Sequence, residues 1–239
     1  MRYGSSLAMY HSLKKLGKNV DIVIPSLPKT FKFLPGAEEI KEEGKKDFTY
    51  DLGIALDCTD IKRLKGFEEY YENAKVKISI DHHGTNTMFA DYNFVEPTAP
   101  ACAQVLLIVL DNMGISLDKK IGTCALTGII TDTGGFRYEG VTAGTFEITA
   151  KLLEIGVNVS EICKKTLQCK TKANFELTKT IINRMEFFEE GKIAFTYITK
   201  EDEKKFKVEP GDHEGLVEIG RDIENVEVSI FLREIEDRI

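Results

Sequence analysis

The sequence has 239 residues, of which 42% are hydrophobic and 30% charged, a composition ordinary for a globular protein with a sizeable core. This length allows one large domain or two modest ones, and we expect two. The formal net charge of -7 excludes a uniformly basic surface and therefore long duplex DNA as a partner. A short oligonucleotide or a small phosphate ester remains compatible, because metal ions and a few Arg or Lys can reverse the potential within one cleft.

The apolar runs and the cysteines indicate in which cellular compartment the protein resides. The longest apolar run, over 105–110, is far shorter than the roughly 20 residues that span a bilayer, so we expect no membrane segment. Five cysteines without a CxxC pair argue against a disulfide framework. We therefore expect a protein of the reducing cytoplasm.

The first part of the chain alternates between helix and strand patterns. Apolar residues from Leu7 to Leu16 recur at helical spacing up to Gly17, and the β-branched stretch 20–24 follows as a predicted strand. Two further strands are predicted over 52–56 and 76–80. Short, continuously apolar strands of this kind are typical of a buried parallel sheet, so we predict an α/β fold with a parallel sheet and flanking helices.

Helical patterns dominate the middle of the chain. Helices are predicted at roughly 100–113, 119–130, 142–156, 160–168 and 172–188. The Glu-Lys cluster at 38–46 predicts a solvated helix or loop.

The character of the sequence changes again from residue 192 onward. Strands are predicted over 193–198 and 226–232, with a helix near 213–223. Two strands and a helix bury little surface, so we expect this second α/β unit to be incomplete. The predicted organisation is a domain over 1–171, a connecting helix over 172–190 and a smaller domain over 191–239.

Chemistry-bearing residues directly follow the two central strands. Asp57 ends one strand, and Asp81-His82-His83 ends the next. Ligands collect beyond the carboxyl ends of parallel strands, and neutral imidazoles with carboxylates suit Mn²⁺, Zn²⁺ and Fe²⁺. The competing interpretation, a polar loop satisfied by water, is weakened because two of the four histidines stand together at this edge.

A third candidate element is the Gly-rich turn that follows a predicted helix. It contains Asp132, a candidate metal ligand, and Arg137, a candidate bidentate phosphate clamp. Asp-Thr-Gly-Gly is by itself also an ordinary turn sequence. The turn therefore supports a metal and phosphate site only in combination with the residues at the strand ends.

Together these motifs resemble the DHH phosphoesterases, most closely the bacterial nano-RNase branch, which is also described as oligoribonuclease and 3'-phosphoadenosine-5'-phosphate phosphatase. The resemblance covers nearly the whole chain. Its carriers are Gly4-Ser5-Ser6-Leu7-Ala8, Leu56-Asp57-Cys58, Asp81-His82-His83, Thr131-Asp132-Thr133-Gly134-Gly135-Phe136-Arg137-Tyr138, and Glu214-Gly215-Leu216-Val217 leading to Arg221.

The resemblance implies a DHH domain, a helical connector and a smaller DHHA1-like domain around a two-metal site, usually of Mn²⁺. Asp57, His82 and Asp132 would be metal ligands, with Asp81 supporting them. His83 would be catalytic and face the scissile phosphate, and Arg137 and Arg221 would contact substrate. Two metal ions can activate water and stabilise charge on phosphoryl oxygens without a nucleophilic side chain.

The implied substrates are RNA oligonucleotides of about two to five residues, cleaved in the 3'-5' direction, and 3'-phosphoadenosine 5'-phosphate. The resemblance is also compatible with a homodimer. Physical argument does not separate this activity from a cyclic-dinucleotide phosphodiesterase or an inorganic pyrophosphatase. An exonuclease of the RecJ type is disfavoured by the acidic balance and the chain length.

The sequence departs from the family pattern in two places. Members carry a His and an Asp-Gly-Asp just before the Gly-Ser-Ser, where Met1-Arg2-Tyr3 stands here, and they end with a Gly-rich segment containing a substrate-binding His. We therefore expect a chain that lacks both ends of the active cleft and holds one metal ion better than two. A catalytically silent nucleotide-binding module is the alternative.

Overall fold

The computed structural model describes residues 2–42 and 49–235. The chain divides into two compact units, one reaching to Gln168 and the other beginning at Cys169. The predicted α/β class with a parallel sheet is confirmed. The roles expected for 1–171, 172–190 and 191–239 stay predictions. No helix in the described parts of the chain is long and apolar enough to cross a bilayer.

The central sheet of the first unit contains three parallel strands in the order β3-β4-β5. They are β3 (Leu52–Leu56), β4 (Val76–Asp81) and β5 (Tyr92–Val95). Leu56 is in register with Ile80, so β3 and β4 end side by side. A separate parallel pair is formed by β1 (Ile22–Val23) and β2 (Ile40–Lys41).

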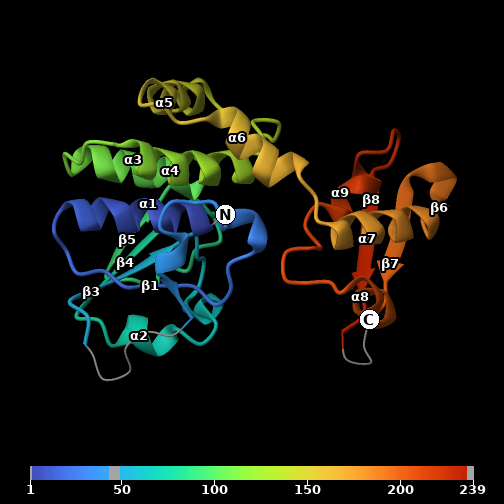
Figure 1. Ribbon diagram of the computed structural model, residues 1–239, viewed down its shortest axis with the longest axis horizontal. Coiled ribbons are helices and arrows are strands. Elements are labelled where there is room, and N and C mark those ends of the chain that lie inside the picture. Colours follow the sequence, from blue (N-terminus) through green and yellow to red (C-terminus); the bar gives the residue numbers. More distant parts are fainter. Residues whose placement is uncertain (1, 43–48, 236–239) are drawn as a thin grey trace. The chain divides into compact units, whose positions relative to one another are not determined.

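Helices cover both faces of this central sheet (Figure 1). The helices α1 (Arg2–Lys15), α3 (Cys102–Asn112) and α4 (Lys119–Asp132) form the main core with the sheet, and α2 (Glu68–Glu72) packs against β3 from the other face. The unit ends with α5 (Ala143–Glu154), α6 (Val159–Cys163) and a π-helical turn over Lys164–Gln168.

A pair of glycines brings α1 and α4 into close contact. A methyl group on Gly4 would lie 2.5 Å from the carbonyl oxygen of Cys124 and 2.7 Å from the backbone nitrogen of Gly128. Only hydrogen fits between these two backbones. The contact fixes the position of α4, whose last residue is Asp132.

Among its described residues, the second, smaller unit contains a three-stranded sheet and three α-helices. β7 (Ile193–Ile198) pairs antiparallel with β6 (Glu186–Phe188) and parallel with β8 (Val228–Arg233). The helices are α7 (Lys172–Asn183), α8 (Lys200–Phe206) and α9 (Leu216–Arg221). Its small core centres on Leu177, Ile181, Ile198 and Leu216.

Two expectations about local structure were wrong, and one helix was not predicted. The helix expected over 172–188 ends at Asn183, and Glu186–Phe188 turns back as β6. The unpredicted helix is α8, which follows residue 198 because Thr199 and Asp202 make a reciprocal capping box at its start. Within the predicted solvated cluster at 38–46, Ile40–Lys41 forms β2, and residues 43–46 lie outside the described residues.

Candidate metal centre

Asp57 stands at the carboxyl end of β3 in an unusual backbone conformation. Its backbone N–H still donates to the carbonyl oxygen of Ile80 at 3.0 Å, but its φ is +56°. Side chains other than glycine, asparagine and aspartate rarely adopt this left-handed conformation. The turn directs the carboxylate into the space beyond the sheet, where the side chain is only 10% exposed.

Asp81, the last residue of β4, is completely buried and accepts hydrogen bonds on both carboxylate oxygens. Its Oδ1 accepts from the backbone N–H of His82 at 2.8 Å and from Nδ1 of His83 at 2.7 Å, while its Oδ2 accepts from Nδ2 of Asn86 at 2.8 Å. A carboxylate occupied in this way holds its neighbours in place and offers little to a metal ion.

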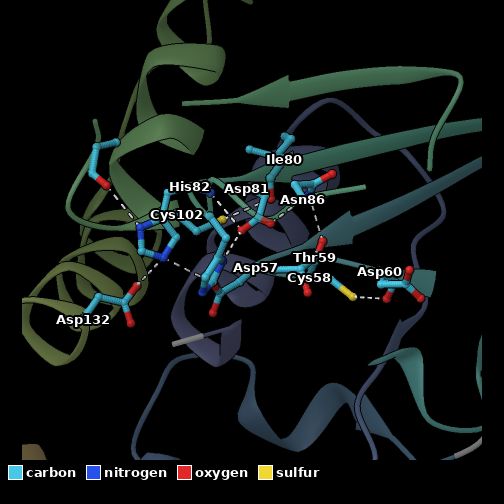
Figure 2. A network of polar contacts seen from close by, with 12 residues as sticks. Asp57, Cys58, Thr59, Asp60, Ile80, Asp81, His82, Asn86, Cys102 and Asp132 are labelled. Carbon is cyan, nitrogen blue, oxygen red and sulfur yellow. Dashed lines mark hydrogen bonds and ion pairs between the residues drawn. The ribbon is translucent and has the colours of Figure 1, made fainter. Parts of the chain in front are cut away.

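His82 has one ring nitrogen whose role the structure fixes. Nδ1 lies 3.1 Å from the carbonyl oxygen of Ala99, and a carbonyl can only accept, so Nδ1 carries the proton. In the neutral ring Nε2 then presents a lone pair. That atom lies 3.5 Å from Oδ1 of Asp57 and 4.0 Å from Oδ2 of Asp132. Figure 2 shows how the labelled side chains of these three residues lie.

His83 faces a different environment from its neighbour. Its side chain is 44% exposed, against 17% for His82, and the two ring planes meet at 61°. Because Nδ1 of His83 donates to Asp81, Nε2 is the nitrogen left for a ligand or substrate. The side chains of the two adjacent histidines therefore face different surroundings.

Asp132 reaches the same place from the carboxyl end of α4 (Figure 2). The end of a helix carries partial negative charge from its last carbonyl groups, so a carboxylate there is unfavourable unless a cation is near. The helix stops because Gly134, Gly135 and Phe136 all have positive φ. A side chain on Gly134 would also collide with the Tyr138 ring.

The structure brings together Asp57, Asp81, His82, His83 and Asp132 in the first unit. Arg137 is exposed, and its Nε donates to the carbonyl oxygen of Gly134 at 2.6 Å. Arg221 ends α9 in the second unit and lies beside Asp222. Substrate contacts by these two residues stay predictions.

The electrostatics of the cluster are dominated by its three carboxylates. Burial by itself would raise the pKa of Asp57, but the nearby rings of His82 and His83 hold that pKa well below its usual range. Burial by itself would lower the pKa of His82, whereas the hydrogen bonds with Asp57 and Ala99 raise it above 6.5. The site therefore favours positive charge between the imidazole and the carboxylates.

These donor atoms fit a divalent cation. Asp57, Asp81, His82 and His83 each offer a ligand atom within 4.8 Å of the others. Within that group Asp81 has both oxygens engaged in hydrogen bonds. Asp132 lies outside the group but 4.0 Å from Nε2 of His82, and the ligand roles of Asp57, His82 and Asp132 stay predictions. A lone pair that faces two carboxylates is repulsive, and a cation held by all three groups removes this repulsion.

Two groups that orient the site escaped sequence reasoning. Asn86 donates from Nδ2 to Asp81 and also to the carbonyl oxygen of Cys58 at 3.1 Å, so it ties the loop after β4 to the loop after β3. The Ala99 carbonyl fixes the His82 tautomer from 17 residues away. Asn86 was findable as a polar residue shortly after the histidines, but nothing in the sequence marks Ala99.

Comparisons with known proteins show which family the chain belongs to. The family model described as "DHH family, N-terminal domain" matches residues 3–129. The bifunctional oligoribonuclease and PAP phosphatase NrnA of Thermus thermophilus is 32% identical over 99% of this chain and 69% of that protein. NrnA of Bacillus subtilis is 22% identical over 99% of this chain and 75% of that protein.

Solved structures give the same fold. An exopolyphosphatase-related protein from Bacteroides fragilis is 28% identical, with a TM-score of 0.90 over 98% of this chain and 72% of its own. A putative family II inorganic pyrophosphatase from Methanococcus jannaschii, 18% identical with a TM-score of 0.56, matches 96% of this chain and 80% of its own and supports the fold alone.

The parallel sheet, the cluster of carboxylates and imidazoles at its carboxyl edge and the matched family together identify the class of the protein as a metal-dependent phosphoesterase. The chain belongs to the DHH family of phosphoesterases, which confirms the resemblance carried by Asp81-His82-His83.

Proposed function

We propose that this protein hydrolyses phosphoester bonds in very short RNA oligonucleotides and in 3'-phosphoadenosine 5'-phosphate, with Mn²⁺ as its cation. The observation that carries the proposal is the position of His82 Nε2 between Asp57 and Asp132. The substrate class rests on the two relatives named as oligoribonuclease and PAP phosphatase, each of which aligns with 99% of the chain.

In this proposal each side chain has a defined task. Asp57, His82 and Asp132 hold the cation, which when bound supplies Lewis acidity that polarises a phosphoryl oxygen and acidifies water. Asp81 keeps the proton on Nδ1 of His83 through their 2.7 Å hydrogen bond. Nε2 of His83 then accepts a proton from the attacking water and passes it to the leaving oxygen. Arg137 and Arg221 would clamp phosphate groups.

The cytoplasm is the compartment we propose. All five cysteines are free, and Cys58, Cys102 and Cys124 are buried. Burial raises the pKa of the Cys102 thiol to about 12, so this thiol is an inert core group at neutral pH.

The test combines metal binding with turnover. Mn²⁺ titrated into the protein should bind, and Mn²⁺ at about 100 times its dissociation constant should stabilise the fold by roughly 2.7 kcal/mol. Asp57→Asn and His82→Ala should each remove the Mn²⁺-induced rise in melting temperature. They should also lower hydrolysis of a dinucleotide and of 3'-phosphoadenosine 5'-phosphate by about 10³-fold or more, because several kcal/mol of charge stabilisation are lost.

The matched control is Asp111→Asn, which removes an exposed carboxylate of the first unit on α3. It should leave both readouts unchanged. Unchanged turnover in Asp57→Asn and His82→Ala would contradict the metal assignment. Mn²⁺ binding without turnover on either substrate would contradict the proposed reaction. A substrate panel that also contains a cyclic dinucleotide and pyrophosphate tests the substrate class. Faster turnover of either compound than of the dinucleotide and 3'-phosphoadenosine 5'-phosphate would contradict the proposed substrates.

A further inference from the structure

The turn that follows α4 is closed by Thr133, which is 1% exposed. Its carbonyl oxygen accepts from the backbone N–H of Arg137 at 2.9 Å and from that of Tyr138 at 3.0 Å. Its Oγ1 accepts from the backbone N–H of Phe136 at 3.0 Å. Three bonds to one buried residue fix the backbone that carries Arg137 and Tyr138. Both side chains therefore start from defined positions, a few residues beyond Asp132 at the end of α4.

Gly134 contacts both of these side chains. Nε of Arg137 donates to the Gly134 carbonyl oxygen at 2.6 Å. A methyl group on Gly134 would lie 2.5 Å from Cζ of the Tyr138 ring, so this ring packs directly on the glycine α-carbon. Only glycine permits the contact, and its φ of +57° is a conformation that other residues rarely adopt. The guanidinium and the ring are thereby held at one point of the backbone.

This point of the backbone is close to the candidate metal centre. Gly134 is two residues beyond Asp132, so their α-carbons are at most about 7 Å apart. Oδ2 of Asp132 is in turn 4.0 Å from Nε2 of His82. A phosphate at the metal centre and a group lying on the Tyr138 ring would therefore be neighbours. The phosphate and the base of one nucleotide, which a single sugar joins, have this relation.

The Tyr138 ring offers a surface on which a base can lie. Tyr138 is 39% exposed, although Gly134 covers part of its ring. Every nucleobase has a flat π-face that stacks on aromatic rings, whereas inorganic phosphate and pyrophosphate have none. The exposed guanidinium of Arg137 beside the ring has the chemistry for a phosphate contact. The turn after α4 thus combines the two kinds of group that a nucleotide requires.

We propose that Tyr138 is the stacking platform for the nucleobase attached to the phosphate at the metal centre. The proposal rests on the proposed hydrolysis of nucleotides and narrows its substrates to phosphate esters that carry a base. Stacking on one aromatic ring contributes about 5- to 150-fold in affinity and depends little on which base is present. The site therefore selects for the presence of a base and not for its identity.

The experiment compares two ligands that differ only in the base, adenosine 5'-monophosphate and ribose 5-phosphate. In calorimetric titrations with Mn²⁺ present, the nucleotide should bind the wild-type protein at least about 5-fold more tightly. Tyr138→Leu keeps an apolar side chain over Gly134 but has no π-face. This variant should bind the nucleotide about 10-fold more weakly and ribose 5-phosphate as the wild type does, whereas Tyr138→Phe should keep both affinities. Unchanged nucleotide affinity in Tyr138→Leu would overturn the proposal.

Tyr92→Leu is the matched control for the leucine variant. Tyr92 is 61% exposed and is the first residue of β5. Because β5 runs parallel to β4, Tyr92 lies at the end of the sheet opposite to the metal centre. Its substitution should leave the affinity for adenosine 5'-monophosphate unchanged. A loss of equal size in Tyr92→Leu and Tyr138→Leu would contradict a platform at Tyr138.

A spectroscopic measurement reports the stacking itself. The fluorescent base 2-aminopurine loses emission when it stacks on an aromatic ring, and the protein contains no tryptophan whose emission would interfere. Emission of 2-aminopurine ribonucleoside 5'-monophosphate at saturating protein should be quenched by the wild type and by Tyr138→Phe. Tyr138→Leu should restore at least about half of this emission. Equal quenching by the wild type and Tyr138→Leu would place the base on another surface and overturn the proposal.

The binding measurements separate the platform from the reaction, because neither ligand has to be cleaved. A base preference that Tyr138→Leu abolishes supports the platform even if the protein hydrolyses neither the dinucleotide nor 3'-phosphoadenosine 5'-phosphate, a result that would contradict the proposed reaction alone. Hydrolysis of both substrates together with equal binding of the two ligands would overturn the platform alone. A lower melting temperature of Tyr138→Leu with wild-type nucleotide affinity would assign the ring a structural role only and would also overturn the platform.

Discussion

Two buried carboxylates, Asp81 in the first unit and Asp202 in the second, are stabilised in different ways. Asp81 accepts only from groups that can be neutral, namely a backbone N–H, an imidazole and an amide. Asp202 receives the Arg184 guanidinium on both oxygens, one bond being 3.1 Å long, together with the backbone N–H and hydroxyl of Thr199.

The difference distinguishes Asp202, a carboxylate that stabilises the fold, from Asp81, a carboxylate within the candidate metal centre. The Arg184–Asp202 pair is neutral in itself and also caps α8, so nothing further is needed there. The cluster around Asp81 includes two more carboxylates, Asp57 and Asp132, and Nε2 of His82 lies within 4.0 Å of both. A bound cation would offset negative charge in this cluster, whereas in the Arg184–Asp202 pair the guanidinium already does so.

The largest effect is expected from Asp81→Asn. The variant keeps the shape of the side chain but cannot accept on both oxygens, so His83 and the loop after β4 lose their common anchor. We expect Mn²⁺ affinity and turnover to fall by about 10- to 100-fold, as for other groups that orient metal ligands. Calorimetric Mn²⁺ titration beside initial rates would measure it. Wild-type Mn²⁺ affinity and initial rates in a folded variant would contradict a role of Asp81 in orienting His83 and the loop after β4.

Arg184→Ala should act on stability and leave metal binding alone. Removing the guanidinium leaves Asp202, 10% exposed, without its charged partner. Because Arg184 is itself 32% exposed, we expect a loss of about 1–2 kcal/mol, less than for a fully buried pair. Hydrogen exchange of β7 amides measures the stability of the second unit.

Lys192→Ala is the matched control for the arginine variant, since the Lys192–Glu227 pair in the same unit is 55% and 67% exposed. It should change β7 exchange much less than Arg184→Ala does. Equal effects of the two substitutions on β7 exchange would mean that the burial of the Arg184–Asp202 pair adds nothing to the stability of the second unit.

The smallest effect concerns pH. Burial alone would raise the pKa of Asp202, but Arg184 and Thr199 hold it below 3.8. The stabilisation is therefore fully present above pH 3.8 and is lost as the pH falls through the lower folded-state pKa. In Arg184→Ala this carboxyl should protonate at higher pH. NMR titration of Asp202 in both proteins would measure the shift, and identical midpoints would contradict the charge argument.

The sequence predicted those parts of the molecule that depend on short patterns. Continuous apolar runs located β3 and β4, and the rule that parallel strands end at one edge placed Asp57 beside Asp81. Asp132 was predicted as part of a motif set, and the structure brings it within 4.0 Å of His82. The roles of these residues in binding and catalysis remain predictions.

Other features depend on contacts that no short pattern carries. β5 alternates between exposed and half-buried residues and lacks a strong apolar run, so its pairing with β4 decides its structure. β6 follows a helical pattern and forms only because it can pair with β7. The separation of the first unit's parallel strands into two sheets is likewise a property of strand pairing, which the residues of β1 and β3 alone do not reveal.

The left-handed backbone at Asp57 has a consequence for how this position can change during evolution. Glycine and asparagine are the residues that tolerate such a φ at least cost, and neither carries a carboxylate. Glutamate keeps the charge, but it adds backbone strain and a longer side chain. In relatives whose function requires the carboxylate, few substitutions of this aspartate are therefore tolerated. In relatives whose function no longer requires it, asparagine or glycine should be the first replacement.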